Sequence, residues 1–103
     1  MKPVIISKQA EFDFEEVYKE SKEEFGETVA NKLFSKFCHF RHSVAFYPYA
    51  YGYYYRSKFI RKFILTKSIL VLYRVSRKHI EIIAVVYAKQ NPVKIKRNIR
   101  KRE

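Results

Sequence analysis

Two neighbouring stretches of the chain repeat apolar residues with the period of an amphipathic α-helix. We expect the first helix to begin near Glu11 and the second to run from about residue 27 to residue 44. Gly26 stands between them, and a glycine is typical just after the last turn of a helix. Because this link is so short, the two helices should pack antiparallel as a hairpin. Their apolar stripes are Phe14, Val17, Tyr18 and Phe25 in the first helix and Ala30, Leu33, Phe34, Phe37, Phe40 and Val44 in the second.

Four other runs have the length and the residue types of β-strands, being rich in Ile, Val, Leu and aromatic residues. One precedes the helices at residues 3–7, and three follow them at residues 58–65, 68–75 and 80–88. The last three runs are joined by links of two and four residues, which favours β-hairpins. The order β-α-α-β-β-β therefore predicts an α+β fold, in which a helical hairpin packs on a mainly antiparallel four-stranded sheet.

The composition indicates one packed domain. The 103 residues include nine Phe and nine Tyr, and 48% of the chain is hydrophobic. We expect the domain to occupy residues 1–92 and a basic tail to occupy residues 93–103. No apolar run approaches the roughly 20 residues that span a bilayer, so no membrane-spanning segment is expected. The chain has a single cysteine, which excludes an intrachain disulfide, and we expect a cytoplasmic protein.

Charge is distributed unevenly along the chain. Residues 1–27 hold four lysines and eight acidic residues, whereas residues 28–103 hold eighteen Lys or Arg and only two acidic residues. A field of this kind favours an anionic partner, such as nucleic acid, an acidic protein or a membrane surface. Charge alone does not choose between these partners.

The segment YPYAYGYYYR, residues 47–56, holds six of the nine tyrosines. It suits a platform for stacked bases, a partner-binding surface or a cover over the core. A stacking platform needs aromatic rings on a basic groove, and no cation is interleaved among these tyrosines before Arg56. If the segment is extended, five tyrosines lie on one side of it, with Ala50 and Gly52 on the other. Since interfaces are enriched in tyrosine, we interpret it first as a partner-binding or hairpin-covering connection.

Three segments, in this order, resemble the RelE/ParE superfamily of toxins from bacterial type II toxin–antitoxin systems. They are DFEEVYKESKEEFGETVANKLF for the helical hairpin, IRKFILTKSILVLYRV for the middle strands and IEIIAVVYAKQNP for the last strand and its exit. Phe25-Gly26 at the bend and Pro48 after the second helix also fit the family. The resemblance covers roughly residues 3–93.

The resemblance implies one of two activities, and in both a cognate antitoxin wraps the toxin and neutralises it. RelE-like members cleave mRNA on the ribosome, using basic residues and a Tyr or His. Here the family's strand arginine falls at Leu70 and its later arginine falls at Lys89, so the catalytic set is incomplete. Strand alternation also puts Arg61 and Lys62 on opposite faces. The nuclease residues that the resemblance leaves are Arg61, Arg74, Tyr87 and Lys89.

The ParE-like branch inhibits DNA gyrase without catalytic residues of its own, and this branch is the better fit. IRKF resembles its arginine at the head of the second strand, and YAKQNP resembles its exit from the last strand. The resemblance therefore implies the gyrase-inhibiting toxin of a plasmid-stabilisation module. A basic nucleic-acid-binding module or a decayed toxin stays open as a further interpretation. The implied target-binding residues are Arg61, Lys62, Lys89, Asn91, Lys94, Lys96 and Arg97, and the implied antitoxin-binding residues are Tyr47, Tyr49, Tyr51, Tyr53 and Tyr55.

The sequence predicts no metal site and no cofactor. Cys38 and His42 would share one face of the second helix, while His39 points elsewhere, so three convergent ligands are not visible. We expect Cys38 to be a small buried thiol.

Overall fold

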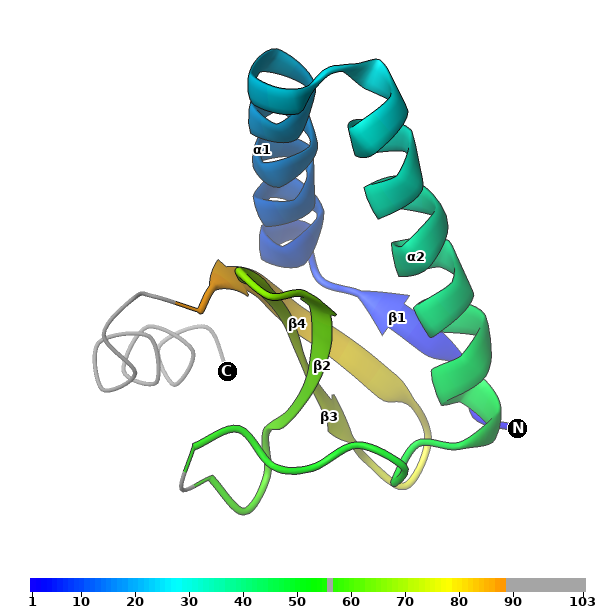
Figure 1. Ribbon diagram of the computed structural model, residues 1–103. Helices are drawn as coiled ribbons and strands as arrows, with labels where there is room; N and C mark the ends of the chain where they lie inside the picture. Colours follow the sequence, from blue (N-terminus) through cyan, green and yellow to red (C-terminus); the bar gives the residue numbers. More distant parts are fainter. Residues whose placement is uncertain (56, 89–103) are drawn as a thin grey trace.

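The computed structural model describes residues 1–55 and 57–88, which form two helices and one four-stranded sheet (Figure 1). The strand order in the sheet is β1-β4-β3-β2, with β1 parallel to β4 and the other neighbours antiparallel. The helical hairpin packs on one face of this sheet, so the predicted α+β fold is confirmed. The elements are β1 Val4–Ile6, α1 Lys8–Phe25, α2 Glu27–Phe46, β2 Arg61–Thr66, β3 Ile69–Val75 and β4 Ile80–Tyr87.

Helix α1 begins at Lys8, three residues earlier than the apolar pattern indicated. Ser7 is the reason, because its Oγ accepts a hydrogen bond from the backbone N–H of Ala10 at 3.0 Å. That bond satisfies one of the N–H groups that lack a partner in a first helical turn. The same hydroxyl donates to the carbonyl of Ile83 at 3.0 Å. The start of α1 is thereby fastened to strand β4.

Gly26 ends α1 and starts α2, as the sequence predicted. Its N–H donates to the carbonyl of Lys22, and its own carbonyl accepts from Ala30 N–H. Its backbone angles, φ 93° and ψ 170°, lie in a region that is accessible essentially only to glycine. One residue therefore reverses the chain, and the two helices lie antiparallel beside each other (Figure 1).

The main core lies between the hairpin and the sheet. Phe14 and Val17 of α1 and Phe37, Phe40 and Val44 of α2 pack there, together with the strand residues Leu65, Ile69, Val71, Tyr73, Ile80, Ile82 and Val85. Two members of the predicted stripes stay largely exposed: Phe25 is 63% exposed, and Phe34 is 51% exposed although its ring lies 6.2 Å from that of Phe14.

A smaller apolar cluster covers part of the opposite face of the sheet. Tyr54 and Ile60 pack there on Leu72, Ile83 and Ala84. The register between β3 and β4 shifts after Leu72, which leaves Ile83 as an extra residue on β4. The segment between α2 and β2 thus contributes residues to both faces of the sheet.

Gly26→Ala should lower the free energy of unfolding by about 1–3 kcal/mol, because alanine is strained at this positive φ although a Cβ would meet no atom within 4 Å. Gly52→Ala is the matched control, since its Cβ also has free space and its φ is not positive. Urea unfolding followed by circular dichroism measures both. Equal stabilities for the two variants would contradict the backbone explanation.

Candidate partner-binding surfaces

The connection between α2 and β2 is held down by an aromatic cluster. Phe40 of α2 stacks on Phe63 of β2, with ring centroids 4.3 Å apart. Tyr51 of the connection meets Phe63 edge-on at 5.1 Å and lies 5.7 Å from Phe40. Tyr73 of β3 closes the cluster, 5.6 Å from Phe40, and its hydroxyl donates to the carbonyl of Pro48 at 2.9 Å. Tyr51 is therefore a half-buried residue that packs the connection against the core, which supports the covering role.

Arg61, at the first position of β2, is the second anchor of the connection. Its Nη1 donates to the carbonyl of Tyr51 at 2.6 Å, and its Nη2 donates to the hydroxyl of Tyr53 at 3.1 Å. Its guanidinium carbon lies 4.3 Å from the ring centroid of Tyr53 and 5.1 Å from that of Tyr49. Such cation–π contacts are worth about 0.5–1 kcal/mol when exposed and more when desolvated. Arg61 thus holds the shape of the tyrosine-rich segment.

The six tyrosines of the segment divide into two groups. Tyr51 and Tyr54 pack in the two apolar clusters, whereas the others are between 47% and 68% exposed. The segment is not extended throughout, because Ala50 N–H donates to the carbonyl of Tyr47 across a turn. The five odd-numbered tyrosines therefore do not share one side. Antitoxin binding by Tyr47, Tyr49, Tyr51, Tyr53 and Tyr55 stays a prediction.

Two of the exposed tyrosines, Tyr49 and Tyr53, border a groove of about 380 Å³, which we call the tyrosine groove. It lies at the end of the sheet where β2 begins and β3 ends. Of its cations, Arg74 forms an ion pair with Glu81 at 3.0 Å. The groove is lined by Tyr49, Tyr53, Lys58, Phe59, Arg61, Arg74 and Val75.

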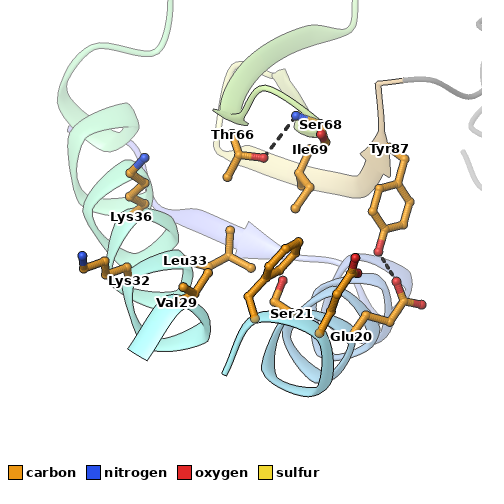
Figure 2. Close-up of a pocket in the computed structure, with 12 residues that line it drawn as sticks. Glu20, Ser21, Val29, Lys32, Leu33, Lys36, Thr66, Ser68, Ile69 and Tyr87 are labelled. Carbon is orange, nitrogen blue, oxygen red and sulfur yellow. Dashed lines mark hydrogen bonds between the residues drawn. The ribbon is translucent and has the colours of Figure 1, made fainter. Parts of the chain in front are cut away.

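A larger groove of about 750 Å³ lies at the opposite end of the sheet, and we call it the hairpin groove. In Figure 2, Leu33 of α2 and Ile69 of β3 point toward one another across it. Its lining is mainly apolar, and its charges are segregated by helix. Glu20 and Glu24 belong to α1, whereas Lys32 and Lys36 belong to α2. The remaining lining residues are Ser21, Phe25, Val29, Thr66, Ser68 and Tyr87.

Sequence reasoning missed the hairpin groove as a site. Its residues come from three separate parts of the chain, and each part taken alone is an ordinary amphipathic element. Two apolar residues close to Gly26 could have indicated this site in the sequence. They are Phe25 and Val29, which are 63% and 45% exposed in the fold. Apolar residues at the turn of a hairpin have little sheet beneath them to pack against.

Tyr87 lies in the hairpin groove, where its hydroxyl donates to Oε2 of Glu20 (Figure 2). Burial, this hydrogen bond and the nearby Glu20, Glu24 and Glu16 carboxylates raise the pKa of Tyr87 to about 12. A phenol that is held protonated in this way is a poor general base near neutral pH.

The nuclease residues that the resemblance implied do not all converge. Arg61 and Arg74 line the tyrosine groove together. Tyr87 pairs with Ile69 at the other end of the sheet, while Arg74 pairs with Glu81. Glu81 and Tyr87 are six positions apart along β4, which is roughly 20 Å at the rise of a strand. Lys89 lies outside the described residues.

Of the seven implied target-binding residues, Arg61 and Lys62 lie within the described part of the chain. Lys62 is half-buried, and it pairs with Leu72 next to the Arg61–Tyr73 pair. Because successive side chains of a strand alternate, Lys62 lies on the face of the sheet opposite to Arg61. Lys89, Asn91, Lys94, Lys96 and Arg97 lie outside the described residues, as does the predicted boundary between the domain and the tail.

The metal-ligand candidates on α2 are ordinary surface residues. Cys38 is exposed, so the expectation of a buried thiol was wrong. Within residues 1–55 and 57–88, no group of three or more His, Cys, Asp or Glu side chains is arranged to hold a metal ion. In the same part of the chain, no helix combines the length and apolar character needed to cross a membrane.

The fold is similar to a chain of a solved structure described as the chromosomal ParDE toxin–antitoxin system from P. aeruginosa. The TM-score is 0.72 and the sequence identity is 16%, over 86% of this chain and 98% of that chain. No protein-family model and no curated protein matches the sequence. At this identity the likeness is one of fold, and it agrees with the fold that the sequence resemblance implied.

Tyr87→Phe should flatten the alkaline loss of stability. The pKa of Tyr87 in the folded state is about 12, above the usual 10. The contribution of Tyr87 to the free energy of unfolding is therefore complete below pH 10 and is lost as the pH rises from 10 toward 12. Phenylalanine cannot ionise, so the variant should lose less stability than the wild type over that window. Urea unfolding at a series of pH values measures the difference. Tyr47→Phe, at an exposed position, is the control and should follow the wild type.

Proposed function

We propose that this chain is the toxin of a bacterial type II toxin–antitoxin module of the ParE-like kind, acting in the cytoplasm on DNA gyrase. The observation that carries the proposal is the fold likeness to a ParDE chain over 98% of that chain's length. The sequence segments that resemble the ParE-like branch support it independently. Inhibition of a large enzyme by binding needs no catalytic residues in the inhibitor, only a shaped surface.

The geometry favours this function over an mRNA endonuclease. Cleavage through a ribose 2′-OH needs a base, an acid and cations around one phosphate. Arg61 and Arg74 lie roughly 20 Å along the sheet from Tyr87 at strand spacing, and the Tyr87 hydroxyl is engaged by Glu20. This separation argues against a RelE-like active site built from these residues.

The hairpin groove is the surface best suited to a neutralising antitoxin. Amphipathic helices dock by placing apolar side chains in apolar grooves, and this groove offers Phe25, Val29, Leu33 and Ile69. Its two charged sides would orient the bound segment, since a basic residue suits the Glu20 and Glu24 side and an acidic residue suits the Lys32 and Lys36 side. We propose that the antitoxin presents an apolar segment flanked by these opposite charges.

Induction of the chain in bacterial cells should arrest growth with DNA double-strand breaks and an SOS response, while translated transcripts stay intact. Purified gyrase should lose supercoiling activity when the purified chain is added. Rapid cleavage of mRNA within codons, with supercoiling unchanged, would instead support the endonuclease alternative. If neither target is affected, the chain is a nucleic-acid-binding module or a decayed toxin.

Val29→Asp should weaken antitoxin binding at least about tenfold, because it places a charge in the apolar lining of the hairpin groove. Aspartate is well accommodated there, since Val29 is the third residue of α2 and acidic residues suit a helix N-terminus. The partner in the assay is the protein encoded beside the gene for this chain, and calorimetry measures the affinity. Ser35→Asp adds the same charge to an exposed position of α2 outside the groove, and should leave the affinity within about twofold. Equal effects of the two variants would place the antitoxin elsewhere.

A further inference from the structure

The tyrosine groove contains the feature that the sequence pattern lacked. Along the chain, no cation stands among the tyrosines before residue 56. In the fold, Arg61 comes from β2 and lies against the rings of both Tyr49 and Tyr53. Lys58 lines the same groove. Aromatic rings and cations are therefore interleaved in space although they are separate in sequence.

The aromatic side chains of the groove are largely exposed, although Arg61 lies over one face of the Tyr49 ring and one face of the Tyr53 ring. Phe59 is 78% exposed and Tyr49 is 62% exposed, while Tyr53 is 47% exposed. Side chains of this size are rarely left so open together on the surface of a monomer without a binding role. Flat apolar faces next to cations are what a stacked nucleobase and its phosphate contact in proteins that bind single strands.

Two cations of the groove, Lys58 and Arg61, have donors that can meet an anion. A guanidinium has five N–H donors. Arg61 donates one hydrogen bond from Nη1 to the Tyr51 carbonyl and one from Nη2 to the Tyr53 hydroxyl, so further N–H donors remain for an anion. The Lys58 side chain forms no hydrogen bond or ion pair within the part of the chain that the structure describes. Among residues 1–55 and 57–88, no carboxylate lines the groove, and Glu81 beside it pairs with Arg74. A cationic groove without an acidic residue favours an anionic ligand.

We propose that the tyrosine groove binds single-stranded nucleic acid, with a base stacked on Phe59 or Tyr53 and its phosphate at Lys58 and the open edge of Arg61. The volume of about 380 Å³ is at the small end of ligand pockets and suits one nucleotide unit rather than a duplex. An acidic peptide would meet the same cations, but its carboxylates would not use the exposed ring faces. The site goes beyond the proposed gyrase inhibition and does not depend on it.

Fluorescence anisotropy with labelled 12-mers of thymidylate and of uridylate, titrated with the full chain, tests the proposal. Lys58→Glu should weaken binding about tenfold and reduce its dependence on salt, because one phosphate contact is lost and a repulsion is gained. Phe59→Ala should weaken binding at least about fivefold, and this loss should persist at higher salt because stacking is not electrostatic. Comparing the DNA strand with the RNA strand shows which nucleic acid the groove prefers. A contact to the 2′-OH would favour RNA.

Matched controls separate the groove from the general positive charge of the chain. Lys67→Glu reverses an exposed lysine in the β2–β3 turn, and Phe12→Ala truncates an exposed phenylalanine of α1; neither lines the groove. Both should stay within about twofold of the wild type, and the thermal unfolding of all four variants should show intact folding. The full chain keeps residues 89–103 in every sample, so their contribution is common to all.

Three results would overturn the proposal. If Lys58→Glu and Lys67→Glu weaken binding equally, the strand is held only by the general positive charge of the chain. A duplex of the same length binding as tightly as the single strand would exclude base stacking. Displacement of the strand by a polyglutamate peptide, together with an unchanged affinity of Phe59→Ala, would identify the groove as a site for an acidic protein segment, such as part of the antitoxin.

Discussion

The stacked pair of Phe40 and Phe63 is the contact that positions helix α2, strand β2 and the connection between them. It joins α2 to the edge strand β2, and Tyr51 and Tyr73 enclose it from the connection and from β3. Aromatic pairs of this kind contribute about 0.5–1.5 kcal/mol beyond the area that they bury. Tyr73 is fully buried, and its hydroxyl fixes the carbonyl of Pro48, where the connection begins. The tyrosine-rich segment is therefore a positioned part of the core and not a free loop.

The hairpin groove follows from a mismatch of lengths. Helices of 18 and 20 residues are about 27–30 Å long, and their turn extends past the link between β2 and β3. Apolar residues that continue the helical stripe beyond the sheet, such as Phe25 and Val29, find little to pack on. The same amphipathic pattern that builds the core thus leaves an apolar surface at the hairpin's end. A partner segment that completes this packing would bury it without any change of the fold.

The fold was predictable from the sequence because its signals are local. Periods of 3.6 and 2 residues, with Gly26 at the bend, determine the element order and the hairpin. The start of α1 was misplaced because Ser7, a polar cap, lies outside the apolar stripe that defined the helix. The site was less predictable, since Arg61 meets Tyr49 and Tyr53 only through a chain reversal. The alternation of side chains predicted from the sequence holds only for an extended segment. In the structure, turns in the tyrosine-rich segment direct Tyr51 toward the core and leave Tyr49 and Tyr53 at the surface.

The two grooves lie at opposite ends of the strands and differ in chemistry. The hairpin groove is apolar with opposed acidic and basic sides, and the tyrosine groove is aromatic and cationic. Roughly 20 Å of sheet separates Arg74 from Tyr87 at strand spacing, so a short segment bound in one groove does not contact the other. Substitutions more than about 10 Å apart with no shared partners act nearly additively. Effects on a protein partner and effects on an anionic ligand are therefore separable in this fold, and a variant that changes both would indicate a partner long enough to wrap the sheet.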